Sequence, residues 1–117
     1  MIAYLAGDRG PDAAILDTAL EDQQVCLPSV VLTELLSDPK LPRRAAAMFK
    51  QFPLLGVSNG YWERAGQLRA RILALRRKAR LADALIAQSC LDHGLALIAR
   101  DDDFRRFAEV AGLRVLP

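Results

Sequence analysis

The stretches that decide the fold and the candidate site are Leu81-Ala-Asp-Ala-Leu-Ile-Ala87 and Leu95-Ala-Leu-Ile-Ala-Arg-Asp-Asp-Asp-Phe104. The first is an apolar helical pattern that contains one carboxylate, Asp83. The second is an apolar run typical of a buried strand, and it ends on three consecutive aspartates. Glu34 occupies a comparable setting, Val30-Val-Leu-Thr-Glu-Leu-Leu36. Because an isolated charge in an apolar environment is costly, such carboxylates usually have a partner or bind a metal ion.

The residue types indicate which metal would fit. Carboxylates without a cluster of histidine and cysteine favour a hard cation that prefers oxygen ligands, such as Mg²⁺ or Mn²⁺. The sequence contains one histidine, His93, which we interpret as a cationic residue at the C-terminus of a helix.

Helical and extended patterns alternate along the chain, which predicts an α/β sandwich with a parallel sheet. Ser29 is a candidate cap for the helix that contains Glu34, and Pro39 should end that helix. The other helices are expected over residues 2–6, 11–22, 42–49, 61–79, 81–92 and 104–111, and strands over 25–27, 54–57, 95–99 and 113–116.

The predicted topology brings the acids together. In open parallel sheets the functional crevice lies at the carboxyl ends of the strands. Asp101 follows the 95–99 strand, Glu34 lies about one turn into the helix after the 25–27 strand, and Asp83 is in the first turn of its helix. We therefore expect these three carboxylates to face the same end of the sheet.

Length and composition place the chain among globular proteins. At 117 residues it should form one domain over 1–117, and no apolar run is long enough to span a bilayer. The start of the sequence lacks the basic region of a signal peptide. Cys26 and Cys90 have no metal-like spacing, so we expect two reduced, buried thiols in a cytoplasmic protein.

Positive charge is concentrated in one segment, although the net charge is only +2. Leu68, Ile72, Leu75 and Ala79 follow helical spacing, which predicts an amphipathic helix with a basic solvent face. That face is either simply solvated or suited to a phosphodiester substrate. The cations are Arg69, Arg71, Arg76, Arg77, Lys78 and Arg80.

The acidic segments resemble the motifs of PIN domains, and most closely those of VapC-like toxins. The resemblance covers essentially the whole chain, with residues 81–108 the most specific part. It rests on Pro28-Ser-Val-Val-Leu-Thr-Glu-Leu-Leu36 and the two stretches quoted first. Matched by motif, Glu34, Asp83 and Asp101 correspond to the second, third and fourth acidic positions, and Asp103 to an additional acid. Asp102 has no fixed counterpart and is taken as a solvated turn residue.

This resemblance implies a three-layer PIN-like fold and an Mg²⁺-dependent endoribonuclease. The carboxylates would hold one or two metal ions that activate water for attack on an RNA phosphodiester. The products would carry a 5′-phosphate and a 3′-hydroxyl. The family also implies a cognate VapB-like antitoxin and a homodimer.

The sequence departs from the family pattern at its beginning. PIN domains carry a first metal-binding Asp at the end of an N-terminal strand, whereas residues 1–5 align with the short helix that follows it. We therefore expect the central strand and its Asp to lie upstream of Met1, with Asp8 a poor substitute because it follows that helix.

Two alternatives from other classes remain. A catalytically silent PIN-like module would bind an antitoxin-like partner without cleaving RNA. A receiver-like phosphoacceptor domain also clusters acids on an α/β fold, but it needs a lysine at the end of a late strand. None of Lys40, Lys50 and Lys78 is placed there.

Overall fold

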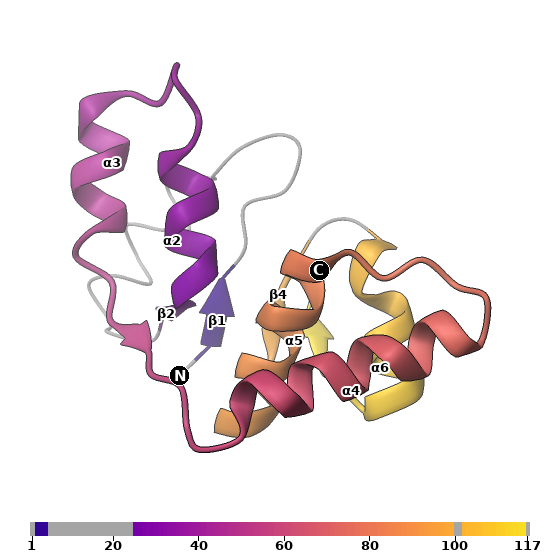
Figure 1. Ribbon diagram of the computed structural model, residues 1–117. Helices are drawn as coiled ribbons and strands as arrows, with labels where there is room; N and C mark the ends of the chain where they lie inside the picture. The colour runs from indigo at the N-terminus through magenta and orange to yellow at the C-terminus, as the bar shows by residue number, and fades with distance from the viewer. Residues whose placement is uncertain (1, 5–24, 100–101, 117) are drawn as a thin grey trace.

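The computed structural model describes residues 2–4, 25–99 and 102–116 (Figure 1). In this part of the chain five strands form one sheet in the order β3-β2-β1-β4-β5, and every adjacent pair is parallel. The predicted α/β class with a parallel sheet is confirmed. The elements are β1 (Ile2–Tyr4), β2 (Val25–Pro28), α2 (Ser29–Leu36), α3 (Arg43–Phe49), β3 (Leu54–Leu55), α4 (Tyr61–Ala74), α5 (Leu81–His93), β4 (Leu97–Ile98), the 3-10 helix η1 (Asp102–Phe104), α6 (Arg105–Ala111) and β5 (Val115–Leu116).

The first strand corrects the prediction of a helix over residues 2–6. Ile2–Tyr4 forms β1, which pairs with β2 on one side and β4 on the other, and the Ala3 amide donates to the Ala96 carbonyl at 2.9 Å. The central position, which we expected to require a strand upstream of Met1, is held by these residues. A strand there satisfies backbone groups of both neighbours, which a helix cannot do because its hydrogen bonds are internal. So short an apolar run gives no period that separates helix from strand.

The β2–α2 junction has a different polar contact from the one predicted. Ser29 was expected to cap α2, but Pro28 occupies the N-cap position and makes no side-chain cap hydrogen bond. The Ser29 hydroxyl instead donates to the Leu55 carbonyl at 2.9 Å, which ties the start of α2 to the end of the edge strand β3. The next helix begins directly after Pro42, as predicted.

Helix α4 is shorter than the predicted 61–79 helix. It ends at Ala74, and residues 75–80 form a non-helical connection to α5. Leu68, Ile72 and Ala79 are buried as expected, whereas Leu75 is 59% exposed. The helical hydrophobic pattern therefore holds up to Ile72, and Ala79 is buried although it lies outside the helix.

Helix α5 lies at the centre of the helical packing. It contacts α4, α2, β2 and η1, and most of its residues between Ala84 and Cys90 are buried. Tyr61, at the start of α4, is buried and donates its hydroxyl proton to the Leu85 carbonyl at 2.6 Å. Trp62 packs edge-on against Tyr61 but is 64% exposed, so only the Tyr61 ring enters the core.

The C-terminal elements are shorter than predicted. Strands β4 and β5 each contain two residues within the expected ranges 95–99 and 113–116. The predicted 104–111 helix is divided into η1 and α6, where Phe104 and Phe107 are buried in contact with one another. The helix expected over 11–22 lies outside the described residues.

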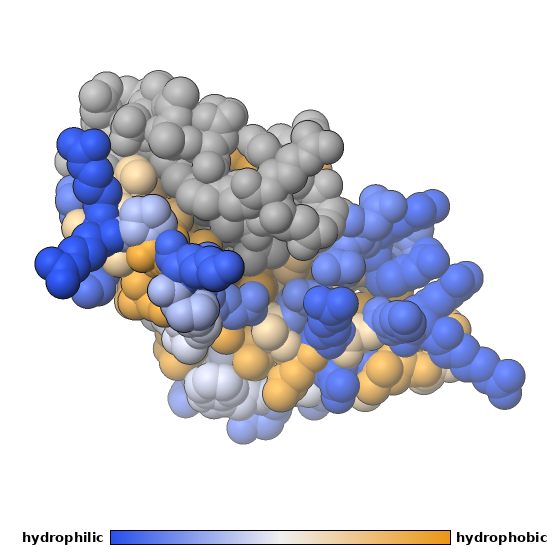
Figure 2. All heavy atoms as spheres, turned by 90° about the horizontal axis from the view of Figure 1, so that it is seen from above, coloured by the Kyte–Doolittle hydropathy of each residue, from blue (hydrophilic) through white to orange (hydrophobic). Residues whose placement is uncertain are grey.

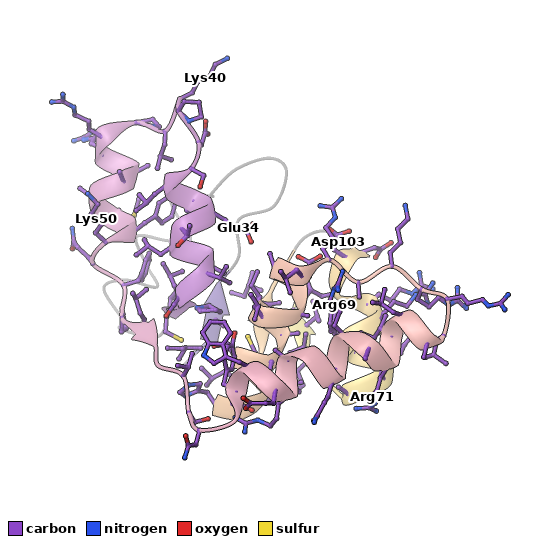
Figure 3. The ribbon with its side chains drawn as sticks, in the orientation of Figure 1. Glu34, Lys40, Lys50, Arg69, Arg71 and Asp103 are labelled. Carbon is purple, nitrogen blue, oxygen red and sulfur yellow. The ribbon has the colours of Figure 1, made fainter. Side chains whose placement is uncertain are left out.

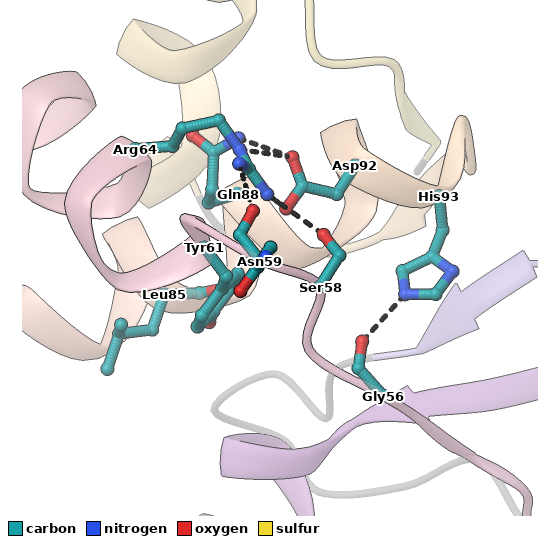
Figure 4. Close-up of polar contacts among 9 residues, drawn as sticks. All are labelled: Gly56, Ser58, Asn59, Tyr61, Arg64, Leu85, Gln88, Asp92 and His93. Carbon is teal, nitrogen blue, oxygen red and sulfur yellow. Dashed lines mark hydrogen bonds and ion pairs between the residues drawn. The ribbon is translucent and has the colours of Figure 1, made fainter.

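An ion pair fastens the start of α4 to the end of α5 (Figure 4). Arg64 donates to both carboxylate oxygens of Asp92 (3.1 and 2.6 Å), to the Asn59 carbonyl and to the Ser58 hydroxyl. The hydrogen bond from Arg64, helped by a second one from Gln88, lowers the pKa of Asp92. The single histidine ends α5, as predicted, and its Nε2–H donates to the Gly56 carbonyl at 2.8 Å (Figure 4).

No helix in the described part of the chain has the length and apolar character needed to cross a membrane. Seen from above, the surface has many hydrophilic side chains at both ends of the molecule (Figure 2).

The Arg64–Asp92 pair predicts a pH dependence of stability. Because the folded-state pKa of Asp92 lies below the ordinary value of 3.8, the pair stabilises the fold fully above that value. Its contribution is lost as the pH falls below 3.8 through the lowered pKa. Asp92→Asn should therefore reduce the free energy of unfolding at neutral pH, with the difference from wild type narrowing in acid.

Urea unfolding at a series of pH values measures this difference. Glu109→Gln is the control, because the ion pairs of Glu109 with Arg105 and Arg106 lie at the surface and should contribute no more than about 1 kcal/mol. If the free energies of unfolding of Asp92→Asn and wild type differed by the same amount at all pH values down to acid, the stabilising role of the Arg64–Asp92 pair would be contradicted.

Candidate functional site at the carboxyl edge of the sheet

The parallel arrangement fixes which edge of the sheet can gather functional side chains. All five described strands end on the same edge, and α2 begins there directly after β2. Helix α5 leads into β4 through the turn at Gly94, so its own N-terminus lies at the level of the strand ends. The end of β4 leads by way of residues 99–101 to η1 at this edge.

Asp83 is the acid at the N-terminus of α5, on this edge of the sheet. It lies in the first turn of the helix and is partly buried. The N-terminal turn is a favourable place for a carboxylate, because unpaired backbone N–H groups carry partial positive charge there. The residues on either side of Asp83 continue the helix into the core, so the fold fixes the position of the carboxylate.

Asp102 and Asp103 belong to η1 and are exposed. The residue that holds η1 in place is Phe104, which is 1% exposed and packs against Phe107 with ring centroids 5.9 Å apart. A polar pair thus precedes a buried aromatic anchor, which leaves the carboxylates at the surface while fixing the backbone that carries them.

A pocket of about 420 Å³ brings these acids together. Asp83, Asp102 and Asp103 all line it, although α5 and η1 are separated by the whole of β4 in the sequence. Of the three acids expected to converge, Glu34, Asp83 and Asp101, this pocket contains Asp83, which lies there with Asp103. The remaining lining residues are all cations: Arg76, Arg77, Lys78, Arg80 and Arg106.

Glu34 is not among the residues that line this pocket. It is exposed on α2, and Figure 3 shows it projecting from α2 towards the side on which Asp103 lies. Helices α2 and α5 are in contact, so the two elements that carry Glu34 and Asp83 are neighbours. Their carboxylates are thus on adjoining helices, although Glu34 does not line this particular pocket.

The set of candidate metal ligands is incomplete in the described part of the chain. Asp101, the predicted fourth acid, lies outside it. Among residues 2–4, 25–99 and 102–116, no group of three or more histidine, cysteine, aspartate or glutamate side chains has the geometry to hold a metal ion. The donor chemistry of the pocket, carboxylate oxygen alone, still matches a hard divalent cation.

The cations were predicted on one helix face, and the structure divides them into two groups. Arg69 and Arg71, on α4, make structural hydrogen bonds to the carbonyls of Ala79 (2.8 Å) and Val110 (3.0 Å). The other four lie in the connection between α4 and α5 and line the pocket. The prediction of a single basic helix face is wrong, because the helix ends before these residues.

The two cysteines do not contribute to the site. Both are buried thiols, as predicted. Burial raises the pKa of Cys90 to about 12, with a smaller effect from Cys26, and burial also raises the pKa of Cys26. Neither is therefore a thiolate near neutral pH, and thiolate chemistry is excluded for them.

The family of the chain is shown by its sequence. The model of the PIN domain family matches residues 1–110. The chain therefore belongs to the PIN domain family. No curated protein sequence matches it.

Solved structures with the same fold come from toxin–antitoxin systems. One is VapBC-5 of Mycobacterium tuberculosis, a member of the VapBC family, with a TM-score of 0.66 and 21% identity over 97% of both chains. Another is VapBC2 of Rickettsia felis bound to a DNA fragment from its promoter, with a TM-score of 0.68 and 17% identity over 98% of both chains. A toxin–antitoxin complex of Klebsiella pneumoniae matches with a TM-score of 0.65 and 19% identity, over 100% of this chain and 97% of that one.

Two features of the pocket were missed at the level of sequence. Asp102 was set aside as a solvated turn residue, yet it lines the pocket with its neighbour Asp103. Arg106 was not selected, although its spacing from the aspartates could have placed it one turn away, on the helix that follows η1.

We predict that Phe104 supports both the fold and the site. Phe104→Ala should lower the free energy of unfolding by about 3–5 kcal/mol, because it empties a fully buried position. Trp62→Ala is the control, since that ring is 64% exposed and its loss should cost no more than about 1 kcal/mol. Chemical denaturation of both variants gives the comparison. Equal losses from the two substitutions would contradict the role assigned to Phe104.

Proposed function

We propose that this PIN domain is a metal-dependent endoribonuclease, and that it is the toxin of a toxin–antitoxin module. The observation that carries the proposal is the single pocket in which Asp83 and Asp103 meet a cluster of cations. Carboxylates suit a divalent cation, and the surrounding guanidinium and ammonium groups suit a phosphodiester. Membership of the PIN family and the toxin–antitoxin origin of the structural neighbours support the same function.

Asp83 and Asp103 are the residues of the pocket that would hold the metal ion, which we propose to be Mg²⁺ or Mn²⁺. Asp101, just before η1 in the sequence, and Glu34, on the neighbouring helix, would complete the ligand set. A bound divalent cation would lower the pKa of a water molecule and offset the charge that develops on the phosphate.

The residues of the chain would then position the substrate. The cations that line the pocket would bind the phosphates on either side of the scissile bond. This would bring the reacting phosphorus close to the carboxylates. Water attacks in line and the bond to the ribose 3′-oxygen breaks. This leaves a 5′-phosphate and a 3′-hydroxyl, and no side chain has to form a covalent intermediate.

A second candidate is a silent module that binds its partner without cleaving RNA. It is favoured by the separation of Glu34 from the pocket and by the lack of a three-acid metal cluster among the described residues. Titration with Mg²⁺ distinguishes the two candidates. An active enzyme should bind the ion through its carboxylates, whereas the silent module should show no saturable binding.

We also propose a partner and an assembly state. A VapB-like antitoxin would block the site by inserting an arginine, because a guanidinium can pair with two carboxylate oxygens in place of a metal ion. A homodimer is supported by the exposed apolar side chains of Leu54, on the edge strand β3, and Val57, two residues after it. The proposed place of action is the cytoplasm.

Asp83→Asn tests the catalytic proposal. Because one charged ligand is lost, Mg²⁺-dependent cleavage of RNA should fall by at least about 100-fold. The variant should remain folded, because Asn keeps the shape of the side chain and Asp83 is only partly buried. Cleavage of labelled RNA is measured with excess Mg²⁺ and with a chelator.

The control is Asp38→Asn, which removes the same charge from the exposed segment between α2 and α3. Asp38 does not line the pocket, so this variant should cleave at the wild-type rate. Cleavage by Asp83→Asn at the rate of the control would refute the assigned role.

The antitoxin proposal predicts a separable partner. Co-expression with the products of neighbouring genes should recover a small protein bound to this chain, and adding that protein should inhibit RNA cleavage. Replacing both Asp83 and Asp103 with Asn should weaken the complex, because the inserted guanidinium loses its ion pairs. A complex of unchanged affinity would exclude insertion of an arginine at this pocket.

A further inference from the structure

The connection between α4 and α5 holds an unusual group of cations. Arg76, Arg77, Lys78 and Arg80 fall within five consecutive residues, all four are exposed, and all four line the pocket. Within the described part of the chain, no hydrogen bond or ion pair is found for any of their side chains. Clustered cations without partners repel one another, so this arrangement is costly for the isolated protein.

The backbone that carries these cations is strained at Arg76. Helix α4 ends in a Schellman motif, in which the Arg76 amide donates to the Leu73 carbonyl (2.9 Å) and the Arg77 amide donates to the Ile72 carbonyl (3.3 Å). This motif requires a left-handed residue after the helix, and Arg76 adopts it with φ of +58°. A side chain is disfavoured in that conformation, and glycine is the usual occupant.

The other left-handed helix C-termini in the described ranges have the usual residue. Helix α5 ends at Gly94 with φ of +64°, and helix α6 ends at Gly112 with φ of +75°. Arg76 is the single residue other than glycine with positive φ in the described ranges. Among the described residues, glycine therefore makes this turn at two helix ends and arginine at one, the C-terminal end of α4, which borders the pocket.

We propose that the segment from Arg76 to Arg80 binds the phosphate backbone of the RNA, and that the strained cap places the Arg76 guanidinium at the pocket. This inference rests on the proposed function and names the residues that hold the substrate. Strained backbone that persists at a site is a recognised sign of function. Here it is combined with exposed, unpartnered cations beside Asp83 and Asp103.

Electrostatics explains why the pocket needs these cations. Three carboxylates line it and would repel a polyanion, while the five cations around them reverse the balance. Guanidinium groups bind phosphate oxygens bidentately, and successive cations along a chain segment match successive phosphates of a strand. An acidic peptide is the competing ligand, because guanidinium groups also pair bidentately with carboxylates, and the binding test therefore includes it.

The substitution Arg76→Gly distinguishes the effect of backbone strain on stability from the effect of the side chain on RNA binding. If Arg76 is present for binding, the glycine variant should be more stable, with a rise in Tm of about 2–5 °C, because the left-handed position is relieved. The same variant should bind RNA about 3–10-fold more weakly at moderate salt, with a salt slope reduced by about 0.7 for the lost phosphate contact. A residue with a purely structural role would not give a gain in stability together with a loss of binding.

Binding is measured by fluorescence anisotropy with a labelled single-stranded polyuridylate in a chelator, so that cleavage does not enter. Arg76→Lys keeps the charge and the strain, and should retain most of the affinity without the rise in Tm. Arg44→Ala removes one positive charge from the exposed surface of α3. This control should leave the affinity within about 2-fold of wild type because Arg44 does not line the pocket.

The results of this binding test can be told apart from those of the RNA-cleavage test of the proposed function. Unchanged RNA affinity in Arg76→Gly would overturn the inference, even if the protein cleaves RNA. Weakened binding in that variant would support it, even if the protein proves catalytically silent. Polyglutamate that bound as tightly as polyuridylate, with the same loss in Arg76→Gly, would also overturn it by showing a site for acidic protein.

Discussion

The burial of α5 is the constraint on which the other elements depend. Its middle turns are covered by α4, α2 and the sheet, so several of its faces must be apolar or able to satisfy their polar atoms. The same helix receives the Tyr61 hydroxyl on its backbone and Arg64 on Asp92, which fixes α4 against it at two levels. These contacts prevent α5 from rotating, and they therefore also fix the position of Asp83 in its first turn.

The parallel sheet determines where the rigidly held Asp83 meets other functional residues. Because all described strands run in one direction, the N-terminus of α5 and the segment that follows β4 reach the same edge. Asp83 and Asp103 meet there through topology, without any direct relation in sequence. Phe104 then holds η1 against α6, so the surface acids are carried by a backbone that is anchored in the core.

Charge gives the pocket its chemical character. Acids and cations line the same hollow, which suits a ligand that combines a metal ion with a polyanion better than it suits a simple cation or anion. By contrast, Arg69 and Arg71 show that positive charge near the site is not always functional, since both bond to backbone carbonyls that close the helix packing. The difference between the two groups of cations follows from where α4 ends.

The sequence by itself determined the α/β class, the positions of most helices and the edge of the sheet at which Asp83 lies, because buried periodicity and the direction of parallel strands leave few alternatives. It could not determine that Ile2–Tyr4 is a strand, since three apolar residues acquire that structure only from neighbours on both sides. Nor could it place the end of α4. Residues 75–80 contain neither glycine nor proline, and a hydrophobic spacing that continues to Ala79 predicts more helix. Only tertiary packing decided that Arg76 turns the chain, because α5 packs against α4 and the connection must bring the chain back to that contact.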